Sequence, residues 1–193
     1  MNASDRDKWN RIYQNHGDCR PNPARVLAEH AYLLPDHGVA VDIACGTGGN
    51  AILLAEHGLE THAWDISDAA VKQLQEYTGN LLTNLIVQQR DVISSPPDPD
   101  TCDVIVVTRF LDRSLIPHII KGLRNNGLVF YQTFIKDKPD EVGPRNPEYL
   151  LDKNELLRFF ISLQILFYRE EGSTGDNSKG FRNEAMLIAR KKK

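Results

Sequence analysis

The stretch from Val39 to Gly49, VAVDIACGTGG, is the most informative part of this 193-residue chain. It begins as an apolar run interrupted only by Asp42, which is typical of a buried β-strand, and the glycines of CGTGG follow at once. From Asn50 onward apolar residues recur at helical spacing. Glycines allow a sharp turn and the close approach of a ligand, and the start of a helix offers free N–H groups. The stretch therefore predicts a strand, a ligand-binding glycine turn and a helix.

On both sides of this stretch, short β-rich apolar runs alternate with helical patterns, which is typical of an α/β fold. We expect the further strands at residues 59–65, 85–89, 102–110, 128–134, 163–170 and 185–191. The run at 102–110 is the most hydrophobic and is expected at the sheet centre. The connection 171–183 is polar and contains no amphipathic helix, so the last two strands should pair antiparallel. The pattern predicts a single-domain, three-layer, Rossmann-like sheet of seven strands, mostly parallel with an antiparallel last strand, and helices on both faces.

The length fits one compact domain, residues 37–193, preceded by a helical segment at residues 1–36. Trp9 and Tyr13 stand four positions apart in that segment, which places them on one face of a helix. They either anchor the segment to the core or close it over a ligand. The interpretation of residues 1–36 as a lid rests on the second alternative.

Two further acids lie at the ends of the next two predicted strands. Asp65 ends the second strand, where its carboxylate would accept hydrogen bonds from both hydroxyls of a ribose. Asp91 follows the third strand and is placed to accept from the exocyclic amine of an adenine, with the Val92 backbone beside it. In an open parallel sheet, ligands bind beyond the carboxyl ends of the strands. These positions together predict a nucleoside site.

The glycines alone do not identify the cofactor, since residues 46–51 also fit the NAD fingerprint G-x-G-x-x-A. Asp42 argues against NAD, because a carboxylate in a buried strand is costly unless it is hydrogen-bonded and that fingerprint usually follows an apolar strand. Asp42 is placed to hold the glycine turn through backbone N–H groups, and also to lie near a ligand ammonium. Both roles are compatible.

Residues 41–58, VDIACGTGGNAILLAEHG, followed by ETHAWDIS at 60–67, resemble motif I and the acidic second-strand end of class I S-adenosylmethionine-dependent methyltransferases, and look most like the tellurite-resistance branch. The resemblance implies S-adenosylmethionine as cofactor and S-adenosylhomocysteine as product. It implies that Asp42, Gly46 and Gly48 line the methionine part, Asp65 the ribose, and Asp91 with Val92 the adenine. The other candidate cofactor-binding residues are Tyr13, Ala44, Asn50, Ile66 and Thr108.

Ala44 is a departure from the family, which often has glycine before the CG pair. We expect alanine to be tolerated there if Ala44 keeps strand dihedrals, so that only the local loop geometry is affected.

Methyl transfer from a sulfonium is an in-line displacement in which the protein chiefly aligns the reactants and excludes water. No nucleophilic residue is needed, and no histidine or glutamate stands out as a general base. The candidate catalytic residue is Arg109, which leaves the buried fourth strand after Thr108. It would orient an anionic acceptor or bind the cofactor carboxylate. The alternative is an ion pair with Asp112 or another surface acid.

Composition sets the remaining expectations. The 23 Lys and Arg against 26 Asp and Glu give a net charge of −3, which favours a small-molecule acceptor over a nucleic acid. Cys19, Cys45 and Cys102 form neither a CxxC pair nor a metal cluster, so no metal is expected. No stretch is apolar enough to span a membrane, so a cytoplasmic protein is expected. An NAD-dependent oxidoreductase and a non-catalytic S-adenosylmethionine-binding protein are the alternatives.

Overall fold

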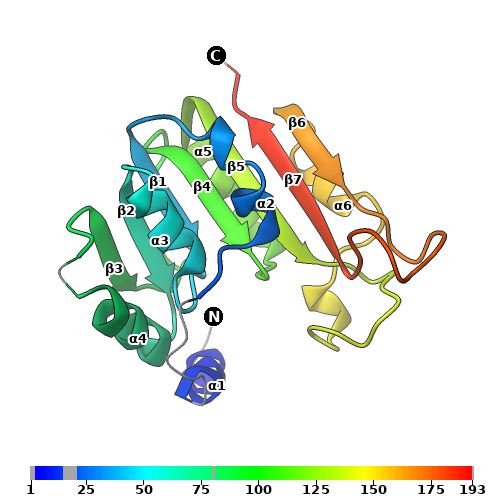
Figure 1. The fold of residues 1–193 in the computed structure, drawn as a ribbon, viewed down its shortest axis with the longest axis horizontal. Coiled ribbons are helices and arrows are strands. Elements are labelled where there is room, and N and C mark those ends of the chain that lie inside the picture. The colour runs from blue at the N-terminus through cyan, green and yellow to red at the C-terminus, as the bar shows by residue number, and fades with distance from the viewer. Residues whose placement is uncertain (1–2, 15–20, 80, 193) are drawn as a thin grey trace.

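The computed structural model describes residues 3–14, 21–79 and 81–192, and a single seven-stranded sheet forms its centre (Figure 1). The strand order is β3-β2-β1-β4-β5-β7-β6. Strands β1 to β5 pair parallel, whereas β7 runs antiparallel between β5 and β6. The strands are β1 Val39–Ile43, β2 Glu60–Asp65, β3 Leu85–Gln89, β4 Cys102–Thr108, β5 Leu123–Phe134, β6 Gln164–Arg169 and β7 Glu184–Arg190. The predicted fold and the antiparallel pairing of the last two strands are confirmed.

Helices cover both faces of the sheet, which gives the three layers expected of the alternating pattern (Figure 1). One apolar cluster lies between the sheet and α2 and α3, and a second lies between the opposite face and α5 and α6. A third, smaller cluster joins α3 and α4 to β2. The helices are α1 Ala3–Gln14, α2 Arg25–Ala28, α3 Gly49–Glu56, α4 Asp68–Thr78, α5 Ile116–Gly122 and α6 Glu155–Phe159. Short 3-10 turns occupy Ala31–Leu33, Arg113–Leu115 and Pro147–Tyr149.

Strand β4 is the central strand of the sheet, as its composition predicts. Val104 and Val106 pack toward α2 and α3, while Ile105 and Val107 pack toward α5 and α6. All four side chains are fully buried. A continuous apolar run suits this position because both faces of the strand exclude water.

Helix α1 lies beyond the carboxyl ends of β1 and β2 and packs on the start of α4 (Figure 1). Asn10 Oδ1 accepts a 2.7 Å hydrogen bond from the Ser67 hydroxyl. Ser67 in turn caps α4 by accepting from the Ala70 N–H at 3.2 Å. Gln73 Nε2 donates to the Tyr13 carbonyl at 2.7 Å. These contacts hold the leading segment across the sheet edge where the sequence predicts a ligand.

Among the described residues, no helix is both long and apolar enough to cross a membrane.

Candidate functional site

The glycine turn after β1 contains three residues in the left-handed backbone region. Gly46 has φ +54° and Gly48 has φ +86°, as expected of a sharp turn. Ala44 also has φ +54°, so the condition of strand dihedrals, on which its tolerance was predicted, is not met. Strand β1 ends at Ile43, because the chain already begins to turn at Ala44. A glycine would adopt this conformation without the steric cost that a Cβ brings.

Asp42 is fully buried and ties β1 to the start of α3. Its Oδ2 accepts from the Ala51 N–H at 3.1 Å, and its Oδ1 accepts from Asn50 Nδ2 at 3.4 Å. Asn50 Nδ2 also donates to Thr108 Oγ1 at 2.9 Å, which links β1 with β4. Burial raises the pKa of Asp42 to about 7 despite these hydrogen bonds, and the charge of Asp65 adds to the rise. Asp42 thus ties β1 to residues 50 and 51 just after the glycine turn, rather than to N–H groups of the turn itself as predicted. The role beside a ligand ammonium stays a prediction.

Asp65 connects the glycine turn to the start of α4. One carboxylate oxygen accepts from the Gly46 N–H and the other from the Ser67 N–H, both at 2.8 Å. The residue is 5% exposed, and burial raises the pKa of Asp65. A carboxylate has about four lone-pair sites, so Asp65 retains acceptor capacity beyond these two bonds and its backbone hydrogen bond with Ile66. A ribose diol would use this remaining capacity.

Tyr13 lies directly over the glycine turn. A Cβ placed on Gly46 would be only 2.6 Å from Tyr13 Oη, so the phenol occupies the space that the glycine leaves. Burial and the nearby Asp65 raise the pKa of Tyr13. Its ring stacks on Trp9 with centroids 6.1 Å apart, which confirms that the two aromatics share a helix face. Helix α1 therefore closes over the position predicted for the methionine part of the cofactor.

The tips of β2 and β3 lie side by side, as the nucleoside prediction requires. The Arg90 N–H donates to the Asp65 carbonyl at 2.7 Å, which joins the two chain segments. Asp91 Oδ1 accepts from the Ile93 N–H at 3.0 Å, and the Val92 side chain is buried in the core. Ile66 follows Asp65, and its carbonyl accepts from Gln89 Nε2 at 3.3 Å. The adenine contacts of these residues stay predictions.

Arg109 lies beyond β4 and reaches across β5 to the first residue of β7. Its Nε donates to Glu184 Oε1 at 2.9 Å. An ion pair of the kind given as the alternative therefore exists, but with an almost buried acid and not with Asp112. Asp112 instead accepts from the Ser114 N–H at 2.9 Å. The Arg109 side chain is 66% exposed, whereas that of Glu184 is only 7% exposed. Arg109 also has φ +53°, a left-handed backbone that is uncommon for a residue with a side chain.

Glu184 and Gln132 belong to the site, although sequence reasoning missed both. Gln132 Nε2 donates to Glu184 Oε2, and Gln132 Oε1 accepts from the Val26 N–H at 2.8 Å. The available signal was the one that identified Asp42: a polar residue in an otherwise apolar strand. Gln132 interrupts LVFYQTF, and Glu184 directly precedes the apolar AMLIA.

Polar residues thus form a row along one edge of the sheet, on the face covered by α2 and α3. They lie near the carboxyl ends of β1, β4 and β5 and at the amino end of the antiparallel β7. Asn50 and Gln132 bind the backbone of the segment that leads into α2, at the Ala24 and Val26 N–H groups. The row consists of Asp42 from β1, Thr108 from β4, Gln132 from β5 and Glu184 from β7. It runs from the glycine turn to Arg109, and so connects the two halves of the candidate site.

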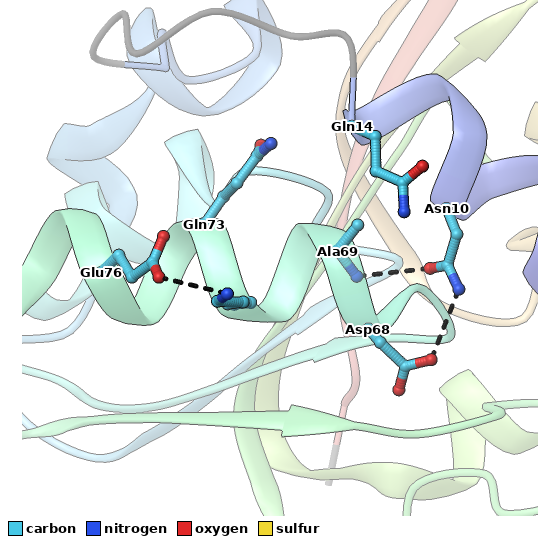
Figure 2. Close-up of a pocket in the computed structure, with 7 residues that line it drawn as sticks. Asn10, Gln14, Asp68, Ala69, Gln73 and Glu76 are labelled. Carbon is cyan, nitrogen blue, oxygen red and sulfur yellow. Dashed lines mark hydrogen bonds and ion pairs between the residues drawn. The ribbon is translucent and has the colours of Figure 1, made fainter.

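Two surface hollows lie apart from these residues. One of about 410 Å³ lies between α1 and α4, and Figure 2 shows Asn10 there bound to Asp68 and to the Ala69 N–H. A second of about 610 Å³ lies at the opposite end of the sheet, around Asp103 and Arg124. Neither hollow includes the glycine turn, because the Tyr13 side chain lies against Gly46.

Residues 41–128 match a family model described as a methyltransferase domain. The release factor glutamine methyltransferase of Staphylococcus aureus is 28% identical over 158 residues, which cover 72% of this chain and 56% of that protein. The chain thus spans about half the length of this curated relative.

Solved structures of similar fold include TehB from Haemophilus influenzae, with a TM-score of 0.69 at 21% identity over 97% of this chain and 67% of that one. A geranyl diphosphate methyltransferase, solved with GPP and sinefungin, has a TM-score of 0.67 at 15% identity over 85% of this chain and 74% of that one. At these identities the likeness is one of fold.

Proposed function

Residues 41–128 match a methyltransferase-domain model, and the sheet has the class I, S-adenosylmethionine-dependent methyltransferase topology, so we propose that the chain transfers a methyl group to a small-molecule acceptor. One observation carries the proposal: the glycine turn, Asp42 and Asp65 converge at the carboxyl ends of β1 and β2. S-Adenosylmethionine supplies an already activated methyl group on a sulfonium. The chain's own part is to bind, to orient and to exclude water.

The residues present fit such a donor. Gly46 and Gly48 supply the left-handed backbone that the sharp turn requires, and Asp65 keeps lone pairs for the ribose hydroxyls. Asp42 and Asp65 are both buried, and burial raises the pKa of each. A positively charged ligand near them would favour their ionised forms. The site therefore suits a cationic adenosyl compound better than a dinucleotide diphosphate.

Topology also argues against an NAD-dependent oxidoreductase. The usual dinucleotide-binding sheet has the order 3-2-1-4-5-6 with parallel strands. Here β7 runs antiparallel between β5 and β6. A glycine turn that matches both fingerprints is thus found in a sheet of the methyltransferase type.

We also propose that helix α1, Ala3–Gln14, acts as the lid that was predicted for residues 1–36, since α2 at residues 25–28 packs in the core. The support is the position of Tyr13, which fills the space above Gly46, and the anchoring of α1 on α4 through Asn10 and Gln73. Because Tyr13 occupies that space, the phenol has to move for a ligand to enter there. The same ring would then exclude water from the reacting centre once α1 closes again.

The small-molecule acceptor is supported by charge, since a chain with a net charge of −3 lacks the basic balance of a dedicated nucleic-acid enzyme. The names of the similar proteins include both a protein-directed and a small-molecule methyltransferase, so they do not decide between the two classes.

Calorimetry tests the cofactor, and label transfer tests the reaction. We expect one S-adenosylhomocysteine to bind per chain and NADH not to bind; the reverse result would overturn the proposal. With methyl-labelled S-adenosylmethionine and a cell extract, label should appear in the low-molecular-mass fraction. Label confined to macromolecules would refute the small-molecule acceptor. Cofactor binding with no product from any extract would favour the non-catalytic alternative.

A further inference from the structure

We infer that the methyl acceptor is an anion, a carboxylate or another oxyanion, and that the outer edge of the Arg109 guanidinium holds it. This inference rests on the proposed methyltransferase function. Arg109 follows β4, the strand that separates the glycine-turn half of the sheet, β3-β2-β1, from β5 and β7. It therefore stands at the boundary between the predicted cofactor site and the adjoining carboxyl edge.

The guanidinium is anchored on one side and free on the other. Its Nε donates to Glu184 Oε1, and within the part of the chain that the structure describes its two terminal nitrogens make no hydrogen bond. Four of the five guanidinium N–H donors are thus available at a 66% exposed side chain. A planar guanidinium edge binds carboxylates and phosphates through two parallel hydrogen bonds.

The next arginine along the chain shows what a purely structural arginine looks like here. Arg113 uses all three of its nitrogens, with Nε and Nη2 bound to Glu155, Nη1 to the Glu148 carbonyl and Nη2 also to the Leu150 carbonyl. It connects the loop after β4 to α6. Arg109 makes a single side-chain contact of this kind and leaves the rest of its donors toward solvent.

Stability does not account for the anchoring of Arg109. Glu184 is nearly buried, and removing a carboxylate from water is unfavourable. An ion pair with an exposed arginine contributes little to the free energy of folding. The amide of Gln132, which is 2% exposed, donates a hydrogen bond to the same carboxylate. The left-handed backbone of Arg109 adds further strain. A fixed orientation of the guanidinium explains this arrangement, because a pre-positioned arginine loses less freedom when an anion binds.

Charge does not oppose the inference. Glu184 neutralises Arg109 from the inner side, through Nε, so an anion would approach the opposite edge. Asp112, the acid nearest in sequence, is engaged with the backbone and hydroxyl of Ser114.

Trifluoroacetate is a suitable probe, because it is a small carboxylate visible by fluorine NMR, and trifluoroacetamide is its neutral match. We expect the protein saturated with S-adenosylhomocysteine to bind trifluoroacetate and not trifluoroacetamide. Arg109→Gln should weaken trifluoroacetate binding at least tenfold, and Arg109→Lys should weaken it less because the charge remains. Arg124→Gln is the matched control: Arg124 is also ion-paired and partly exposed, but it lies at the opposite end of the sheet.

Calorimetry of S-adenosylhomocysteine with each variant separates the two proposals. Its affinity should be unchanged by Arg109→Gln; a large loss would assign Arg109 to the cofactor carboxylate and overturn the inference. Equal binding of trifluoroacetate to wild type and Arg109→Gln, or no binding to wild type, would also overturn it. Failure of the wild-type protein to bind S-adenosylhomocysteine would instead defeat the proposed function.

Discussion

Replacement of Asp65 by alanine tests the candidate site at its most constrained carboxylate. The substitution removes the acceptors of two buried N–H groups, those of Gly46 and Ser67. An unsatisfied buried donor costs about 1–3 kcal/mol. Burial of the carboxylate is itself unfavourable, as the raised pKa of Asp65 shows. Its removal therefore offsets part of this loss of stability. We expect the free energy of unfolding to fall by about 2–4 kcal/mol in Asp65→Ala.

Urea unfolding measures this change through the shift of the midpoint, provided that the slope with denaturant stays constant. Asp112→Ala is a useful control, since Asp112 accepts from the Ser114 N–H at a more exposed turn. We expect it to lose about 1 kcal/mol or less. Equal stabilities of wild type and Asp65→Ala would refute the assignment of Asp65 as the tie between the glycine turn and α4.

The same variant tests the ribose role independently of stability, in buffer without urea and at a temperature where the variant is fully folded. Losing charged hydrogen bonds to a bound polar group should weaken S-adenosylhomocysteine binding by about 1.5–3 kcal/mol, which is roughly 10- to 150-fold. Unchanged affinity in calorimetry would refute the ribose assignment, whatever the stability result.

Three further predictions concern the rest of the site. Ala44→Gly should stabilise the protein by about 0.5–1 kcal/mol, because relief of the left-handed strain exceeds the entropic disadvantage of glycine; a lower urea midpoint would contradict this. Asp42 has a pKa of about 7 in the folded state, above its value in the unfolded state, so the folded state binds more protons between these two pKa values. The stability of wild type relative to Asp42→Asn should therefore fall as the pH rises from 5 to 7, by up to about 1.4 kcal/mol per pH unit. A stability difference independent of pH in urea titrations would refute that assignment. Glu184→Ala should lower the free energy of unfolding by about 1–3 kcal/mol in thermal unfolding, since it leaves the buried Gln132 amide without its acceptor. Glu184→Gln should lose less stability, because its amide oxygen can still accept that hydrogen bond. Equal losses in the two variants would show that this acceptor does not matter.

The sequence by itself determined the features that depend on local pattern. The run VAVDI followed by CGTGG specifies a strand and a turn, because alternation, apolar content and glycine act within a few residues. The antiparallel pairing of the last two strands follows from the polar connection at 171–183, which contains no helix. Even Asp42 could be identified in this way, since a lone acid in a buried strand needs a partner nearby.

Only the tertiary structure decided which distant groups meet. Glu184 is 75 positions from Arg109, and no local pattern indicates that β7 inserts beside β5 to bring the two together. The left-handed backbone of Ala44 and the position of Tyr13 over Gly46 likewise depend on contacts between separate elements. Strand order and helix docking are set by the burial of whole faces, so the partner of a polar side chain at a strand end is decided by packing rather than by its neighbours in sequence.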